Sequence, residues 1–217
     1  MPKLIVATRN RHKTQEMAAI LGPKWVVEDL TGKPNLPEPE ETGNTFEENA
    51  AIKALTASRA LNGLVLADDS GLEVDALDGA PGIRSARYAG KNATDQENRD
   101  RLLEELARLN HIAEEPMAAR FHCAMALAEG GKVLGIFCGR VEGRIVLAEA
   151  GTGGFGYDPL FIPEGYGQTF AELDPATKNR LSHRARAMEQ MVEWLGRRQG
   201  PDECTDPRQC RSGATRL

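Results

Sequence analysis

A chain of 217 residues with a formal net charge of −5 is long enough for one sizeable hydrophobic core, or for two small lobes that share a sheet. The acidic balance argues against a general nucleic-acid binder, which carries a broad basic surface. No apolar run approaches the roughly 20 residues that span a bilayer, and the first residues show no signal-peptide pattern. We therefore expect a cytoplasmic protein that binds neither nucleic acid nor membrane.

The spacing of apolar, glycine, proline and capping residues predicts alternating helices and strands. Thr45–Glu48 and Thr94–Glu97 carry the capping-box pattern, in which threonine and glutamate satisfy each other's backbone amides at a helix start. In chain order, the predicted elements are a strand at 3–8, helices at 13–21 and 45–61, a strand at 64–67, a helix at 94–109, strands at 120–128, 132–140 and 144–148, a short helix after 174, and a last helix from 182 that stops at 196.

This order of elements predicts a single α/β domain with a mixed sheet over residues 1–196. The chain from 197 to 217 is polar and has no hydrophobic period, so we expect a disordered tail. The last helix is expected to bury one apolar face, which comprises Ala185, Met188, Val192 and Leu195.

The four cysteines carry no recognisable metal or redox motif. None belongs to a CxxC pair, which argues against zinc and thioredoxin-like chemistry. Cys123 and Cys138 fall in predicted strands, where we expect small buried hydrophobic side chains. Cys204 and Cys210 fall in the predicted tail and are expected to be reduced.

Residues 8–13 form a polar turn between the first strand and the first helix. The free backbone amides of a helix start and the ammonium group of Lys13 suit a phosphate group. A turn with a solvated lysine is the competing interpretation, and the segment by itself favours neither.

Two adjacent acids, Asp68 and Asp69, follow the buried strand predicted at 64–67. Their mutual repulsion must be compensated, and Mg²⁺ is a common solution because it prefers hard oxygen ligands. A turn that is capped by aspartate and ended by Gly71 is the alternative. A second acidic cluster, which by itself is best interpreted as a solvated loop, comprises Glu38, Glu40 and Glu41.

The glycine-rich loop at 151–156 matches the GxGxxG pattern of dinucleotide-binding proteins, but the helix that such a site requires does not follow it. The loop predicts instead a close approach of backbone to a ligand and the stacking of an aromatic ring on a base. Phe155 and Tyr157 are the candidate rings. A tight turn with both rings in the core is the competing interpretation.

A basic cluster lies around the start of the last helix. Ser182 has the N-cap position, which places His183 and Arg184 in the first helical turn, and Lys178 precedes them. Positive charge there opposes the helix dipole, and a local violation of this kind often marks a functional residue. The guanidinium fork of Arg184 suits the carbonyl oxygen and ring nitrogen of a purine.

Taken together, these segments resemble the inosine triphosphate pyrophosphatase family, house-cleaning enzymes that act on dITP, ITP and XTP. The matching segments follow the family order and are Thr8–Asn10 with Lys13, Glu41–Gly43, Phe46–Ala50 with Lys53, Ala67–Leu72, Gly79–Gly82, Ser85–Tyr88, Gly151–Asp158 and Ser182–Arg184. Arg9 departs from the small residue that is usual in the family, and the pair Arg11-His12 is more basic than is common.

The resemblance implies two α/β lobes around a long curved mixed sheet, a substrate cleft between the lobes, and a homodimer. It implies Mg²⁺ as cofactor, Asp69 as general base and metal ligand, and Glu41 as second ligand, with Glu40 as an alternative. The implied substrate-binding residues are Thr8, Asn10, Lys13, Lys53, Ser70, Phe155, Gly156, Tyr157, Asp158, Lys178, His183 and Arg184. The lysines would neutralise the phosphates, Phe155 would stack on the base, and the residues Asp158, His183 and Arg184 would contact its polar edge.

The residues and the resemblance together predict hydrolysis of purine nucleoside triphosphates to a monophosphate and pyrophosphate. Asp69 would take a proton from a water molecule that attacks the α-phosphorus, while the metal and the lysines stabilise the leaving pyrophosphate. Two rival functions are open. A phosphatase with Asp68 or Asp69 as nucleophile would release orthophosphate, and a nucleotide-binding module would turn over no substrate.

Overall fold

The computed structural model of this chain describes residues 1–36, 39–109 and 117–198. The strands are β1 (Lys3–Val6), β2 (Val26–Glu28), β3 (Leu64–Val74), β4 (Met117–Glu129), β5 (Lys132–Ile145) and β6 (Phe161–Pro163). The helices are α1 (Arg11–Leu21), α2 (Phe46–Ala60), α3 (Asp95–Arg108), α4 (Pro175–Leu181) and α5 (His183–Arg198). Within these described residues, no helix is long and apolar enough to cross a membrane.

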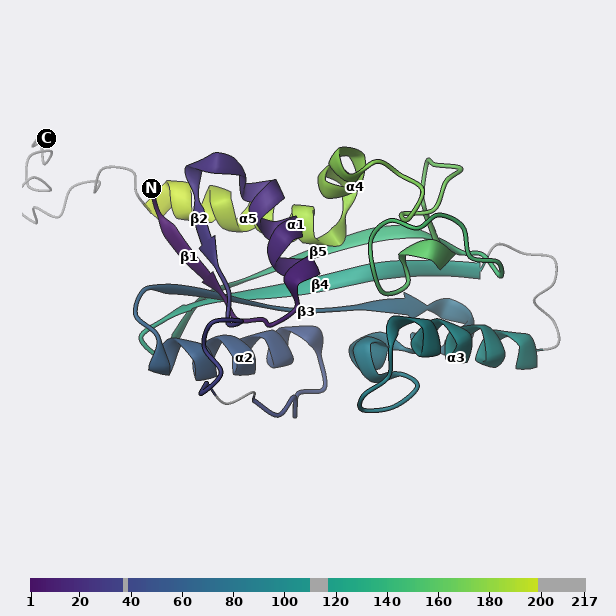
Figure 1. Cartoon of the computed structure of the whole chain (residues 1–217), viewed down its shortest axis with the longest axis horizontal. Coiled ribbons are helices and arrows are strands. Elements are labelled where there is room, and N and C mark those ends of the chain that lie inside the picture. Colours follow the sequence, from purple (N-terminus) through teal and green to yellow (C-terminus); the bar gives the residue numbers. More distant parts are fainter. Residues whose placement is uncertain (37–38, 110–116, 199–217) are drawn as a thin grey trace, which may run out of the picture.

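The strands form one mixed sheet in the order β2-β1-β3-β4-β5-β6. β1 runs parallel to β2 and β3, whereas β3 to β6 pair antiparallel in succession. The long strands β3, β4 and β5 run the length of the molecule; α2 and α3 lie on one side of them and α1, α4 and α5 on the other (Figure 1).

The hydrophobic core divides between the two ends of the long strands. At one end Leu72 and Phe121 of the sheet pack with Leu102 of α3 and with Phe161. At the other end α1 and α5 cover one face of the sheet and α2 covers the opposite face. The predicted α/β fold, with two lobes on one mixed sheet, is therefore confirmed.

The strand predicted at 64–67 is longer than expected, because β3 continues through the two aspartates to Val74. Successive side chains of a strand point to opposite faces. Asp68 contacts Lys13 of α1, whereas Asp69 contacts Lys53 of α2. Two adjacent acids are tolerated in the middle of a buried strand because each finds its own cation, on opposite faces of the sheet.

Three smaller expectations are wrong. Gly143 does not separate two strands, since β5 runs through it. A Cβ atom at this position would lie 2.3 Å from the carbonyl oxygen of Ile162, so the glycine allows β6 to pair closely with β5. The last helix continues past Gly196 to Arg198. Val192 is 40% exposed, and Met191 is buried instead. The predicted tail from residue 199 onward, with its two cysteines, lies outside the described residues.

The two predicted capping boxes differ in outcome. The box at the start of α3 is complete, with Thr94 and Glu97 each accepting from the other's backbone amide. At the start of α2, Thr45 accepts from the amide of Glu48, but the Glu48 carboxylate accepts from the amide of Asn44 at 2.6 Å. The glutamate therefore anchors the loop that precedes the helix as well as the helix itself.

The contact of β5 with the start of α5 yields a stability prediction. A Cβ atom at Gly139 would lie 2.1 Å from the carbonyl oxygen of His183 and 2.7 Å from the amide nitrogen of Ala187. Both atoms are backbone, so Gly139→Ala must displace α5 and should lower the free energy of unfolding by about 1–3 kcal/mol. Urea denaturation measures this loss.

The matched control is Gly196→Ala in the last turns of α5, where a Cβ atom has nothing within 4 Å. Alanine favours a helix, so this variant should be as stable as the wild type or slightly more stable. Equal stability of the two variants would contradict the close packing of β5 on α5.

Candidate active site

The turn between β1 and α1 is held by its own side chains. Thr8 Oγ1 accepts a hydrogen bond from the amide of Asn10 at 3.1 Å, and Asn10 Oδ1 accepts from the amides of His12 at 2.9 Å and Lys13 at 3.3 Å. Asn10 is the N-cap of α1. This cap fixes the direction of α1, and the Lys13 ammonium lies 3.0 Å from Asp68 Oδ1. Lys13 is thus engaged in the cleft, not solvated.

Asp68 is buried among hydrogen-bond donors on the α5 side of the sheet. Besides Lys13, it accepts from Ser70 Oγ at 2.5 Å and from Arg184 Nε at 3.4 Å. Burial alone would raise the pKa of Asp68, but Lys13, Arg184 and Lys53 outweigh it and hold the pKa well below its usual range. Asp68 is therefore an anion at every physiological pH.

Asp69 has the opposite character. Its carboxylate accepts from Lys53 Nζ at 2.7 Å and from Asn49 Nδ2 at 3.3 Å, both on α2. Burial raises the pKa of Asp69; Lys53 opposes this rise and the nearby Glu41 carboxylate adds to it. Neighbouring carboxyl groups whose pKa values are pushed apart are typical of acid–base sites, and the group with the raised pKa is the one suited to proton transfer.

Glu41 completes an acidic group on the same side of the sheet. Its Oε1 atom lies 2.8 Å from Lys53 Nζ, and its other oxygen accepts from the Arg87 guanidinium. Burial would raise the pKa of Glu41, but Lys53 and Arg87 lower it below its usual value. Glu41 and Asp69 thus both contact the Lys53 ammonium group. Their two contacting oxygens therefore lie no more than two hydrogen-bond lengths from each other.

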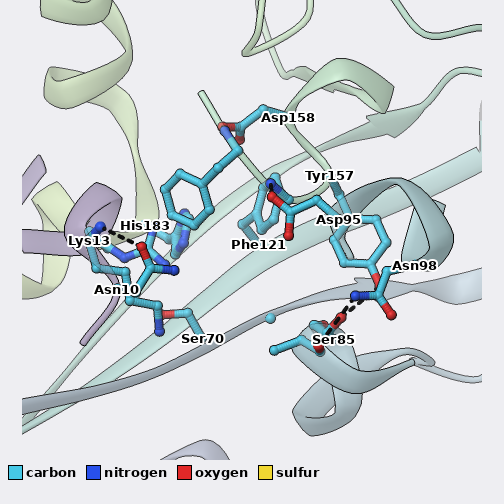
Figure 2. Close-up of a pocket in the computed structure, with 15 residues that line it drawn as sticks. Asn10, Lys13, Ser70, Ser85, Asp95, Asn98, Phe121, Tyr157, Asp158 and His183 are labelled. Carbon is cyan, nitrogen blue, oxygen red and sulfur yellow. Dashed lines mark hydrogen bonds between the residues drawn. The ribbon is translucent and has the colours of Figure 1, made fainter. Parts of the chain in front are cut away.

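The site comprises two adjoining pockets. The first is lined by aromatic rings and polar side chains (Figure 2), and the second is lined mainly by charged and polar side chains from the β1–α1 turn, the Glu41 loop and the Arg87 segment. Asn10, Lys13 and Ala86 line both pockets, so the two are continuous. A ligand with a flat apolar end and a highly charged end fits this division.

Phe155 stands in the first pocket between two lobes of the molecule. One of its faces stacks on His12, with ring centroids 5.5 Å apart and planes at 22°. The cations of Arg184 and Lys178 lie 5.1 and 5.2 Å from its ring centroid. The ring is only half-buried, so of the two interpretations of the glycine-rich loop the ligand-facing one suits Phe155.

Tyr157 fits the competing interpretation, a tight turn with the ring in the core. It is buried, and its hydroxyl donates to the carbonyl oxygen of Ser85 at 2.9 Å. The hydrogen bond ties the glycine-rich loop to the turn after β3. Gly154, at φ +70°, is required in this loop, because a Cβ atom there would lie 2.0 Å from Asp158 Oδ2.

A buried ion-pair network supports the rings. Lys178 Nζ lies 2.6 Å from Asp158 Oδ2 and 2.6 Å from Glu16 Oε1, and Arg184 Nη1 lies 3.0 Å from Glu16 Oε2. Asp158 also accepts from the amide of Phe155 at 2.8 Å. The network fixes the loop that carries Phe155 to α1, α4 and α5, and it places Lys178 beside the aromatic pocket, not beside Lys13 and Lys53.

His183 closes the inner end of the first pocket. Its ring stacks on Phe121 with centroids 4.9 Å apart and planes at 11°. Burial lowers the pKa of His183 well below its usual value, so the ring is neutral. Its Nδ1 atom is buried and has no hydrogen-bond partner among the described residues.

The structure gathers the predicted site residues in one place. Most of them line the two pockets, while Asp69 and Lys178 lie one contact behind the lining, against Lys53 and Asp158. Arg9, the departure from the family pattern, donates to the carbonyl oxygen of Leu36 at 2.7 Å.

Sequence reasoning assigned no role to several residues that shape the site, namely Glu16, Asn49, Ser85, Arg87 and Phe121. Asn49, Ser85 and Arg87 stand inside segments that carried the family resemblance, so a signal was present for them. Glu16 and Phe121 stand in a helix and a strand with nothing in their spacing to distinguish them.

The comparisons with known proteins agree with this geometry. The profile of the Ham1 family matches residues 4–194. A dITP/XTP pyrophosphatase of Oceanobacillus iheyensis is 46% identical over 197 residues, which are 90% of this chain and 98% of the relative. The protein of that name from Geobacter sulfurreducens is 48% identical, with the same coverage. The structure of a HAM1 protein from Coxiella burnetii superposes with a TM-score of 0.79 at 42% identity and covers 91% of this chain and 100% of that chain.

The ion-pair network yields a prediction with a defined pH dependence. Lys178→Met leaves the buried carboxylates of Glu16 and Asp158 without their shared ammonium, which should cost about 3–5 kcal/mol of unfolding free energy near neutral pH. In the variant both pKa values rise, so the carboxyl groups take up protons as the pH falls. The loss relative to wild type should therefore shrink between about pH 7.5 and about pH 5.

Urea denaturation at both pH values measures this effect. The control is Lys3→Met, which removes an exposed pair with Glu28 and should leave the stability almost unchanged at either pH, because solvent screens surface ion pairs. A Lys178→Met loss that is as small as the control, or that grows as the pH falls, would contradict the pairing.

Proposed function

The chain belongs to the Ham1 family, and from this premise we propose that it hydrolyses the noncanonical purine nucleoside triphosphates dITP, ITP and XTP to a nucleoside monophosphate and pyrophosphate. One observation carries the proposal: an aromatic pocket and a charged pocket join at Asn10 and Lys13. A purine base and a triphosphate chain need adjoining sites of these two kinds.

The charged pocket supplies the phosphate contacts. Lys13 and Lys53 offer ammonium groups, and the turn of Thr8 and Asn10 offers polar groups at the start of α1. Arg87, which pairs with Glu41, adds a guanidinium fork on the opposite wall of this pocket. Because these cations lie near carboxylates, they can exchange one anionic partner for another without passing through an unpaired state.

Glu41 and Asp69 fit a Mg²⁺ ion. Their oxygens already surround one positive charge, the Lys53 ammonium, at 2.8 and 2.7 Å, and Mg²⁺ prefers hard oxygen donors of this kind. Glu40 lines the same pocket and is the alternative second ligand. When bound, the ion supplies charge neutralisation on the phosphate oxygens.

Asp69 is the general base of the proposed reaction. A water molecule placed for attack on the α-phosphorus gives its proton to the Asp69 carboxylate, and the bond to the leaving pyrophosphate breaks. Lys53 and Lys13 stabilise the negative charge that grows on the leaving group. The raised pKa of Asp69 supports this role, and the fully engaged, strongly acidic Asp68 is better suited to holding Lys13 and Arg184 in place.

The aromatic pocket selects the base. We propose that the purine stacks on Phe155 in place of the His12 ring, with Arg184 and Lys178 near position 6. Inosine and xanthosine carry a carbonyl acceptor there, which pairs with these donors, whereas adenosine carries an amino donor. A buried donor that faces another donor costs about 1–3 kcal/mol, which corresponds to roughly 5- to 150-fold in selectivity.

The homodimer and the cytoplasmic location that the resemblance implies stay predictions, as does the division into a domain at 1–196 and a tail at 197–217. Mass measurement in solution tests the dimer.

Product analysis tests the proposed function directly. ITP, dITP and XTP, incubated with the protein and Mg²⁺, should yield monophosphate and pyrophosphate, whereas ATP should react slowly and no substrate should react after chelation of the metal. Ion-exchange chromatography separates the products. Release of orthophosphate would support the phosphatase alternative, and tight binding without turnover would support the binding module.

The role of Asp69 has its own test. Asp69→Asn keeps the size of the side chain but replaces one of its two acceptor oxygens by an amide donor and cannot accept a proton, so turnover should fall by at least about 10²–10⁴-fold. Steady-state turnover of ITP at saturating Mg²⁺ measures this loss.

The matched control for Asp69→Asn is Asp78→Asn, an exposed aspartate at φ +51°, a conformation that asparagine tolerates well. It should keep wild-type turnover. Near-full activity of Asp69→Asn would exclude Asp69 as the base.

A further inference from the structure

A second group of metal-ligating side chains lies on the α2 side of the sheet, outside both pockets. Glu47 is in the first turn of α2, His122 is on β4 and Cys138 is on β5, and one ligand atom from each lies within 4.8 Å of the other two. Cys138 Sγ donates to Glu47 Oε1 at 3.4 Å, and His122 Nε2 lies 3.8 Å from the same oxygen.

The two separations that involve Glu47 Oε1 are close to those of a tetrahedral metal site. Ligand atoms at zinc bond lengths of about 2.0–2.3 Å are roughly 3.3–3.6 Å apart. The sulfur–oxygen distance already falls in that range, and the nitrogen–oxygen distance needs only a small rotation of the half-exposed Glu47 carboxylate. The three ligands come from three different elements, so the pattern could not be found from spacing along the chain.

His122 gives independent support. It is 3% exposed, and among the described residues its Nδ1 atom has no hydrogen-bond partner. Nδ1 faces Glu73 Oε1 at 3.9 Å, while Nε2 faces Glu47 Oε1 at 3.8 Å. Metal-binding histidines characteristically direct the second ring nitrogen at a carboxylate, which fixes the ring and its tautomer. The edge of the Phe46 ring packs against His122 at a centroid distance of 4.8 Å and holds it in this orientation.

We propose that Glu47, His122 and Cys138 bind a divalent cation of the zinc class, with a fourth position left to solvent. Thiolate and imidazole select borderline and soft metals, in contrast to the oxygen ligands of Glu41 and Asp69. Binding releases the Cys138 thiol proton to solvent. The site has three protein ligands and an open side, because Glu47 and Cys138 are both partly exposed.

The site ties the start of α2 to β4 and β5. The same helix carries Asn49 and Lys53, both of which hold Asp69. An ion at Glu47 therefore stabilises the helix on which the arrangement around Asp69 depends, without touching the proposed substrate. The proposal does not rest on the proposed function, since its tests measure metal binding and thermal stability.

Cobalt titration tests the proposal, because a thiolate bound to Co²⁺ gives a charge-transfer band in the near ultraviolet. The full chain is used with Cys204→Ser and Cys210→Ser, which leaves Cys123 and Cys138 as its cysteines. With excess Mg²⁺ present, one equivalent of Co²⁺ should produce the band, and Zn²⁺ should displace it. Zn²⁺ should also raise the melting temperature.

The band should vanish in Cys138→Ala and persist in Cys123→Ala, the matched control on the opposite face of the sheet. Glu73→Gln, which changes a positioning residue without removing a ligand, should keep the band and weaken Zn²⁺ affinity by about tenfold. Glu47→Gln should weaken it by at least as much and lose the zinc-dependent rise in melting temperature.

The absence of a band at one equivalent of Co²⁺, or a band that persists in Cys138→Ala, would overturn the proposal. So would equal Zn²⁺ affinity in the wild type and in Glu47→Gln.

Discussion

The buried Asp68 carboxylate is the contact on which the arrangement of the cleft depends. It draws together Lys13 from α1, Arg184 from α5 and Ser70 from its own strand. A buried anion is stable only when it is paired and hydrogen-bonded, so its cations are held where it needs them. Through this one group, the two helices that cover the sheet meet β3 at the junction of the aromatic and charged pockets.

The pleat of β3 turns two adjacent acids into two different chemical groups. Asp68 faces α1 and α5 and is held strongly acidic, while Asp69 faces α2, where burial raises its pKa. No change of residue type is needed for this difference; one step along a strand reverses the face. The face toward α5 therefore positions cations, and the face toward α2 is left with a carboxylate suited to accept a proton.

The sequence allowed the fold class, the capping of α3 and part of the pocket lining to be predicted, because capping boxes, glycine turns and charged motifs are local signals. The continuation of β3 through its aspartates could not be predicted, since the cations that permit it come from α1, α2 and α5. The same holds for the pairing of Lys178 with Glu16, which are far apart in the chain. Val192 was misplaced because the buried face of α5 runs through Ala187, Met188, Met191 and Leu195, which leaves Val192 at its edge.

The cleft pairs its cations with its own carboxylates: Lys13 with Asp68, Lys53 with Asp69 and Glu41, Arg87 with Glu41, and Lys178 and Arg184 with Glu16. Such a cluster is close to neutral, so it can remain folded around buried charge. A triphosphate that entered alone would compete for these cations and leave the carboxylates uncompensated, whereas one that brings a divalent cation replaces the positive charge it takes. The metal requirement of the proposed reaction thus follows from the charge balance of the protein as well as from the chemistry at phosphorus.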